Sequence, residues 1–210
     1  MPKGRLITIE GLEGAGKSTS IETIATLLDD HGVSYITTRE PGGTDLGENV
    51  REILLAHSNM PMHAMTELLL MFAARVEHVH KIITPALEAG RWVICDRFTD
   101  SSYAYQGGGR GLALEDISKL ENIVLPGIKP DYTLMLDVPV EEGLARAGSH
   151  SSLDRFEQEE VAFFERARQV FLKQSEENDR FYVIDAARAV TSVQEDIAQW
   201  IISVIRETAT

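Results

Sequence analysis

The stretch "GLEGAGKST" (residues 11–19) decides the fold of this 210-residue chain. It matches the P-loop pattern, Gly-x-x-x-x-Gly-Lys-Ser, and it stands between a strand-like run and a helix-like run. Its glycines let the backbone wrap phosphates, while the following helix adds positive potential. Lys17 is expected to reach the β and γ phosphates as a catalytic cation, and the Ser18 hydroxyl to ligate Mg²⁺. The predicted ATP site comprises Gly11, Gly14, Ala15, Gly16, Lys17, Ser18 and Thr19.

Strand-like and helix-like segments alternate along the whole chain. The strand candidates are residues 5–10, 34–39, 92–96, 132–138 and 181–186. Helical patterns lie between them, including residues 17–30, 64–88 and 156–177. Several strand candidates are apolar at successive positions, as in strands that are covered on both faces. The pattern predicts an α/β fold of the P-loop NTPase class: a three-layer sandwich with a five-stranded parallel sheet flanked by helices, in one domain over residues 1–210.

Composition narrows the possible partners. Lys plus Arg number 20 and Asp plus Glu number 33, so the formal charge of −13 disfavours nucleic-acid binding. The single cysteine, Cys95, lies in an apolar run and cannot form an internal disulfide, which fits a reducing compartment. We see no signal peptide and no apolar run long enough to cross a bilayer, so we expect a cytoplasmic protein without a membrane partner.

Charged residues close several of the predicted strands. Ligands of open parallel sheets bind outside the carboxyl ends of the strands. Arg39 and Arg97 end neighbouring strand candidates, and we predict that they converge on a second phosphate. The alternative for Arg39 is a pairing with surface acids, which would contribute little. Asp96 is expected to orient Mg²⁺ or its waters, or else to pair with Arg97, and Asp137 to be structural.

Several motifs together resemble those of one family. "IEGLEGAGKST", "TREPGGT", "FAAR", "DRF", "SSYAYQGGGRG" and "LDRFE" occur in the order found in thymidylate kinases. The chain is similar to the bacterial form, whose P-loop lacks an arginine, and the resemblance covers nearly all of it. It implies a fold of the nucleoside monophosphate kinase type and the reaction ATP + dTMP ⇌ ADP + dTDP, which serves dTTP synthesis. It also implies Mg²⁺ and a homodimer.

The resemblance assigns roles around the acceptor phosphate and sugar. Glu13 is expected to bind the deoxyribose 3′-hydroxyl, which explains a carboxylate inside a phosphate-binding loop. Arg39 and Arg97 are expected to bind the acceptor phosphate, and Arg97 to bridge toward the transferred group. Glu40 and Arg51 are expected near the same site. Ser101, Ser102, Tyr105 and Gln106 align with the segment that contacts base and sugar, with Tyr105 filling the space of a ribose 2′-hydroxyl.

Base recognition falls on the segment "LLLMFAARVEHV". By resemblance, Arg75 donates to a thymine carbonyl while an aromatic residue stacks on the ring. That aromatic residue usually lies four positions before the arginine. In this chain Met71 occupies that position, and Phe72 is the next residue. We expect Phe72 to stack on the base, and we leave open a contact between Met71 and the base. His78 and His80 are interpreted as ordinary helix or interface residues.

The lid of the resembled family is rich in arginine, but here its middle, residues 148–152, reads "GSHSS". The lid segment, residues 146–156, therefore keeps Arg146 and Arg155 as flanking cations. We expect both to be catalytic, with Arg155 the stronger donor to the transferred phosphoryl group. The alternative is that both form exposed helix pairs.

Other functions remain open at this point. A deoxynucleoside kinase also uses a P-loop and an Asp-Arg pair, but it phosphorylates a hydroxyl and so needs a base. Another nucleoside monophosphate kinase would differ in base recognition. A P-loop regulatory ATPase would need partner surfaces that the sequence does not reveal.

Overall fold

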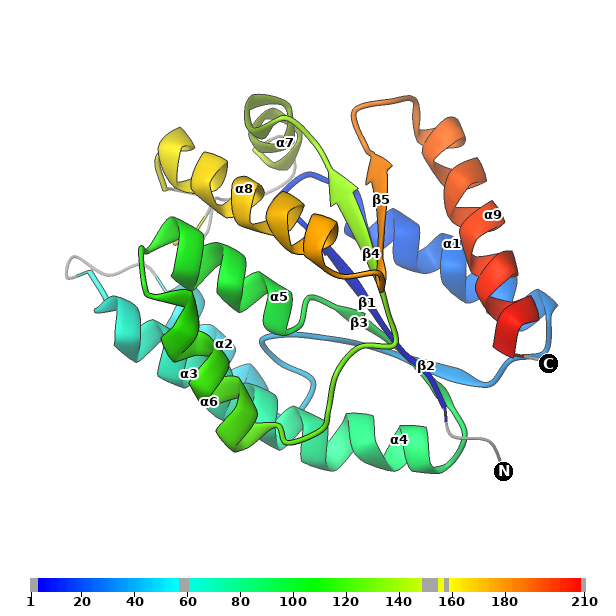
Figure 1. Ribbon diagram of the computed structural model, residues 1–210, viewed down its shortest axis with the longest axis horizontal. Coiled ribbons are helices and arrows are strands. Elements are labelled where there is room, and N and C mark those ends of the chain that lie inside the picture. Colours follow the sequence, from blue (N-terminus) through cyan, green and yellow to red (C-terminus); the bar gives the residue numbers. More distant parts are fainter. Residues whose placement is uncertain (1–3, 57–60, 149–154, 157–158, 209–210) are drawn as a thin grey trace.

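The computed structural model describes residues 4–56, 61–148, 155–156 and 159–208, in which parallel strands alternate with helices (Figure 1). The strands are β1 (Leu6–Gly11), β2 (Tyr35–Arg39), β3 (Trp92–Asp96), β4 (Tyr132–Asp137) and β5 (Phe181–Asp185). The first helical elements are α1 (Lys17–Asp30), α2 (Asp45–Leu55), α3 (Ala64–His78), η1 (Val79–Ile83) and α4 (Thr84–Glu88). Those that follow are α5 (Thr99–Ser102), η2 (Tyr103–Gly109), α6 (Leu114–Val124), α7 (Val140–Ala147), α8 (Val161–Glu177) and α9 (Val190–Thr208). The elements η1 and η2 are π-helical.

The five strands form one parallel sheet in the order β2-β3-β1-β4-β5. The predicted α/β fold with a five-stranded parallel sheet is therefore confirmed. Because β1 and β2 both pair with β3, Ile9 and Arg39 lie in register with Asp96 from either side. The P-loop and the segments that follow β2 and β3 thus meet at one edge of the sheet.

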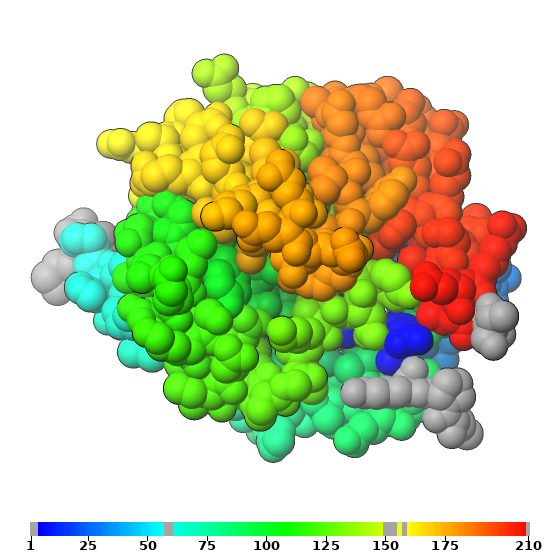
Figure 2. Space-filling model, viewed as in Figure 1, coloured from blue at the N-terminus to red at the C-terminus, as the bar shows by residue number. Residues whose placement is uncertain are grey.

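Two helical layers cover the sheet. Alternate residues of β1 divide between them: Ile7 and Ile9 pack in a core with α1 and α9, whereas Leu6 packs with α3 and η1. Near β4 and the P-loop, α8 and η2 add a third apolar cluster around Phe164 and Phe171. Figure 1 shows α1 and α9 together on one side of the sheet and α8 on the other, and in Figure 2 side chains of α6 and α8 cover much of the molecule from this view.

The helix boundaries differ from the expected ones in two places. The helical pattern over 64–88 is divided into α3, η1 and α4, because the π-helical turn Val79–Ile83 interrupts the α-helical hydrogen bonding. The helix expected from residue 156 begins at Val161. Within the described residues, no helix combines the length and the apolar character that a bilayer crossing would require.

Candidate active site

A cavity of about 680 Å³ opens at the carboxyl ends of the strands. At one end it is lined by the P-loop residues Glu13, Gly14, Gly16, Lys17, Ser18 and Thr19. At the other end it is lined by Glu40, Arg51, Met71, Arg75, Ser102 and Gln106. Asp96, Arg97, Ser101, Tyr105 and Arg146 also line it. One continuous cavity therefore joins a phosphate-binding loop to a second polar region.

The P-loop is held tightly by its surroundings. Gly14 has a φ of 69°, and a Cβ at this position would lie 2.0 Å from the backbone oxygen of Gly143 in α7, so only glycine fits. The Lys17 ammonium group donates to the carbonyl oxygens of Gly11 (3.2 Å) and Leu12 (3.0 Å). Burial, together with repulsion from Arg97, lowers the pKa of Lys17 to about 8. A bound polyphosphate would favour the charged form of this lysine.

The Glu13 carboxylate is bound by two side chains from outside the P-loop. It accepts hydrogen bonds from the Arg97 guanidinium (2.9 Å) and from the Tyr105 hydroxyl (2.9 Å to each oxygen). The Arg97 guanidinium also lies 4.9 Å from the centre of the Tyr105 ring. Glu13 therefore belongs to a polar cluster with Arg97 and Tyr105 that lines the cavity, where a hydroxyl donor could reach it.

A buried carboxylate supports the turn that carries Arg97. Glu10, at the end of β1, accepts from the Phe98 backbone N–H (2.7 Å) and from the Ser101 hydroxyl (2.6 Å). Burial, with repulsion from Asp100, raises the pKa of Glu10 to about 8. Arg97 has a φ of 66°, in the left-handed region that few residues other than glycine adopt. The hydrogen bonds to Glu10 hold the backbone immediately after this strained position.

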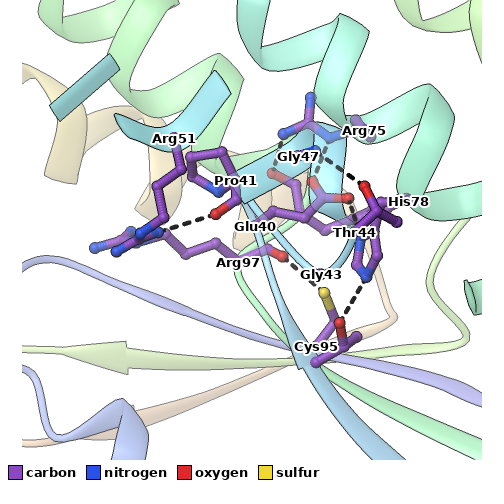
Figure 3. Close-up of polar contacts among 12 residues, drawn as sticks. Glu40, Pro41, Gly43, Thr44, Gly47, Arg51, Arg75, His78, Cys95 and Arg97 are labelled. Carbon is purple, nitrogen blue, oxygen red and sulfur yellow. Dashed lines mark hydrogen bonds and ion pairs between the residues drawn. The ribbon is translucent and has the colours of Figure 1, made fainter. Parts of the chain in front are cut away.

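The far end of the cavity holds a buried ionic cluster (Figure 3). The Arg75 guanidinium donates to Glu40 (2.5 Å), to the Ser102 hydroxyl (3.0 Å) and to the Phe98 carbonyl (3.0 Å). The other carboxylate oxygen of Glu40 contacts His78 Nδ1 at 2.9 Å. Sequence reasoning missed His78, although its spacing of three residues from Arg75 places both on one helical face.

Arg39 does not join Arg97 in the cavity, so the predicted convergence of these two residues is wrong for this structure. Arg39 is half-exposed and pairs with Glu48 at 2.9 Å, which is the surface pairing considered as its alternative. Side chains alternate along a strand, so Arg39 and the buried Glu40 point to opposite sides. Arg51 from α2 lines the cavity instead, and Figure 3 shows its guanidinium and that of Arg97 extending to the same side of the Glu40–Pro41 turn.

The choice of Phe72 over Met71 also needs correction. Phe72 is buried in the core that α3 shares with β1 and β3, and Met71 lines the cavity. Met71 precedes Arg75 by one helical turn and so shares its face, whereas the next residue is rotated by about 100°. Phe72 still acts on the site indirectly, because the Arg75 guanidinium lies 4.6 Å from the centre of its ring.

The two arginines that flank the lid differ in position. Arg146 lines the cavity and pairs with Glu142 at 2.5 Å. Arg155 instead pairs with the fully buried Glu67 at 2.7 Å and donates to the Leu54 carbonyl at 2.7 Å. The rest of the lid, residues 149–154, lies outside the described residues.

Glu67 is a second residue that sequence reasoning missed. Its carboxylate also accepts hydrogen bonds from Gln106 (2.8 Å) and from Arg110 (3.2 Å). The available signal is its spacing of one helical turn before Met71, which places both residues on the cavity-facing side of α3.

Two oxygen ligands for a cation lie near the P-loop. Ser18 and Asp96 both line the cavity, and Asp96 Oδ1 is buried without a hydrogen-bond partner among the residues that the structure describes. Such an oxygen suits Mg²⁺ or a water bound to it, because Mg²⁺ prefers oxygen ligands and usually keeps several waters. The described residues contain no group of three or more His, Cys, Asp or Glu that could hold a metal. Phosphate oxygens and waters would therefore have to supply most of the ligands.

The P-loop on β1–α1 and the second polar site across one cavity define a phosphotransferase of the nucleoside monophosphate kinase type. Comparisons with known proteins identify the particular family. The thymidylate kinase family model matches residues 9–197, so the chain belongs to the thymidylate kinase family.

Relatives and a solved structure agree with this assignment. The chain is 55% identical over 195 residues to a thymidylate kinase of Pseudomonas putida, covering 92% of this chain and 93% of the relative. It is 52% identical to a thymidylate kinase of Teredinibacter turnerae, over 92% of this chain and 95% of the relative. The crystal structure of thymidylate kinase from Ehrlichia chaffeensis superimposes with a TM-score of 0.76 at 34% identity, covering 95% of this chain and 99% of that one. The enzyme is thus a thymidylate kinase.

Proposed function

We propose that the protein transfers the γ-phosphoryl group of Mg²⁺·ATP to dTMP, within dTTP synthesis in the cytoplasm. The observation that carries the proposal is the single cavity that runs from Lys17 in the P-loop to Arg75 on α3. A nucleoside triphosphate enters at the first end, and a nucleoside monophosphate enters at the second. The two phosphate chains meet beside Arg97.

In the proposed reaction, an oxygen of the dTMP phosphate attacks the γ-phosphorus of ATP. The bond from this phosphorus to the β–γ bridging oxygen breaks, and ADP leaves. No general base is required, because the attacking oxygen is already anionic. Alignment and charge neutralisation supply the rate enhancement. Mg²⁺, held near Ser18 and Asp96, would neutralise the β and γ phosphates.

The cationic side chains divide the remaining work. Lys17 contacts the donor phosphates, and Arg51 and Arg97 hold the acceptor phosphate. Arg146, which lines the cavity, meets the charge of the transferred group. Arg155 is farther from this task, because it is paired with Glu67. The Glu13 carboxylate accepts from the 3′-hydroxyl of the deoxyribose.

Arg75 is the proposed base-reading residue. Within the described part of the chain, three of its five donors are used by Glu40, Ser102 and Phe98, and Arg75 lines the cavity. A free donor can meet a thymine carbonyl, whereas the amino group of cytosine would face it unfavourably. Leaving a buried donor unpaired costs about 1–3 kcal/mol, so dTMP should be preferred over dCMP by roughly tenfold to a hundredfold in kcat/KM.

A homodimer would account for apolar residues on the surface of the chain. Leu46 and Ile53 of α2 are half-exposed, as is Leu69 of α3, and Val76 follows Leu69 by seven residues. The helices α2 and α3 pack on each other. Each therefore carries one exposed apolar pair whose members are two helical turns apart, and the two pairs lie on neighbouring helices. Burial of such side chains against a second copy would stabilise a dimer. Sedimentation velocity of the purified protein distinguishes a dimer from a monomer of 23.3 kDa.

The activity itself is tested by incubating the purified protein with Mg²⁺·ATP and a panel of acceptors. Thymidine, dTMP, dUMP, dCMP and a no-acceptor control are followed by ADP release and by chromatography of the products. Formation of dTDP from dTMP is the expected result. Phosphorylation of thymidine alone would indicate a deoxynucleoside kinase, and ADP release independent of acceptor would indicate a regulatory ATPase.

A further inference from the structure

His78 lies inside the molecule between two polar partners. Its side chain is fully buried, its Nδ1 contacts Glu40 at 2.9 Å, and its Nε2 contacts the Thr38 hydroxyl at 2.6 Å. Because Arg75 donates to the same carboxylate, Glu40 acts as an acceptor and Nδ1 donates to it. A continuous chain of contacts therefore runs from Thr38 on β2 through His78 and Glu40 to Arg75.

The His78 ring also determines the shape of the turn after β2. Gly43 has a φ of 79°, and a Cβ there would lie 2.6 Å from two atoms of the ring, so the backbone of the turn packs directly on the imidazole. Two other contacts tie the turn to α2: Glu48 accepts from the Gly43 N–H (2.9 Å), and Arg51 donates to the Pro41 carbonyl (3.0 Å). His78, like the Arg75–Glu40 pair, ties the turn to α3, and so to the end of the cavity that Arg75 lines.

We propose that His78 is a positioning residue for acceptor recognition, acting through Glu40 to hold the Arg75 guanidinium at the base end of the cavity. The proposal rests on the proposed function, in which Arg75 reads the thymine base. Glu40 holds the Nε side of Arg75, and Ser102 and Phe98 hold its terminal nitrogens. Without His78, the Glu40 carboxylate loses one of the two side-chain partners that it has among the described residues and gains freedom to rotate. Arg75 would then lose its fixed direction, while the contacts of Lys17 with Gly11 and Leu12 in the P-loop, which do not involve His78 or Glu40, would be unaffected.

Two substitutions distinguish this role from simple packing. In His78→Asn, the amide nitrogen takes the place of Nδ1 and can still donate to Glu40. In His78→Gln, the amide nitrogen takes the place of Nε2 and keeps the contact to Thr38 only. The matched control is His80→Gln, which changes an exposed histidine two residues away.

The experiment measures kcat, KM for dTMP, KM for ATP and the dTMP/dCMP ratio of kcat/KM. We expect His78→Gln to raise KM for dTMP about tenfold and to reduce the dTMP/dCMP ratio, with KM for ATP unchanged. His78→Asn and His80→Gln should stay within about threefold of wild type. Two results would overturn the proposal. One is an equal increase of KM for dTMP in His78→Asn and His78→Gln, and the other is a KM for dTMP in His78→Gln that equals the value in His80→Gln.

A failure of this proposal can be distinguished from a failure of the proposed function. If wild-type protein does not phosphorylate dTMP, the proposed function fails before any variant is compared. If the His78 variants do not fold, as judged by thermal melting, Thr38→Val carries the test. This variant keeps the ring and removes its Nε2 partner, so it should raise KM for dTMP about threefold, and an unchanged KM would count against the relay.

Discussion

Replacing Tyr105 with phenylalanine removes one oxygen atom from the centre of the site. That hydroxyl donates to the Glu13 carboxylate, at 2.9 Å from each oxygen, and the ring packs among Phe156, Phe163 and Phe171. Phenylalanine keeps the ring packing and keeps Arg97 over the ring face. The substitution therefore isolates the hydrogen bond to Glu13 from the shape of the cavity.

The size of the effect follows from the environment of this hydrogen bond. A hydrogen bond to a charged group contributes about 1.5–3 kcal/mol, and Glu13 keeps Arg97 as a partner, so we expect a loss of about 2 kcal/mol. For a chain of this size, each kcal/mol lowers Tm by about 2–4 °C, which gives a decrease of about 4–8 °C. If Glu13 binds the acceptor sugar, kcat/KM for dTMP should fall about tenfold or more.

The companion substitution, Tyr105→Ala, removes the ring as well. Truncating a buried aromatic residue costs about 3–5 kcal/mol, so Tm should fall by about 6–20 °C. The cavity would also gain room near the sugar. The dTMP preference over its ribonucleotide analogue, measured as a ratio of kcat/KM values, should then decrease in Tyr105→Ala and stay unchanged in Tyr105→Phe.

Steady-state kinetics with both nucleotides gives the two kcat/KM values of each protein and hence their ratio, and differential scanning calorimetry gives its Tm. An unchanged ratio in Tyr105→Ala would place the steric selection against ribonucleotides elsewhere. Wild-type Tm and kcat/KM in Tyr105→Phe would show that the hydroxyl does not hold Glu13.

Three further predictions concern charged residues. Lys17→Ala should remove most activity while Tm changes little, and near-normal turnover would contradict the P-loop assignment. Glu10 has a pKa of about 8 against an ordinary value of 4.5, so the folded state retains a proton that the unfolded state loses. Its contribution to stability therefore declines between pH 4.5 and 8, and the Tm advantage of Glu10→Gln over wild type should grow across that interval. Arg146→Ala should lower kcat about a hundredfold or more. Arg155→Ala should mainly destabilise the protein, by about 2 kcal/mol, through loss of the pair with Glu67. A larger fall of kcat in Arg155→Ala than in Arg146→Ala would show that Arg155 supplies the charge that faces the transferred phosphoryl group.

The fold could be predicted because its signals are local. Most strands are short apolar runs bounded by polar residues, β2 is rich in β-branched residues, and Gly14 and Gly16 of the P-loop stand between β1 and α1. Apolar strands covered on both faces and separated by helices leave few arrangements other than a parallel sheet. The interruption of the helical pattern by η1 was not predicted, although Pro85, which has no backbone N–H to donate to Lys81 of that turn, lies within the pattern.

Site residues could be predicted only where their position in the sequence determines the direction in which the side chain points. Lys17, Ser18 and Arg97 directly follow strands or open a helix, and the structure brings all three to the cavity. Arg39 and Phe72 have the right chemistry, but each lies one residue from the position that faces the cavity. A rotation of about 100° on a helix, or of about 180° on a strand, separates a cavity residue from a core or surface residue.

Buried ionic residues escaped prediction for a different reason. Glu67 and His78 lie on α3 at positions with no distinguishing sequence context, and their partners come from other elements of the chain. Both residues nevertheless share the face of α3 that carries Met71 and Arg75, since Glu67 precedes them by four and eight residues and His78 follows them by seven and three. A polar residue in phase with a predicted binding residue on an apolar helix therefore indicates burial beside the site. This rule makes His78 the residue whose replacement best separates base recognition from phosphoryl transfer in this enzyme.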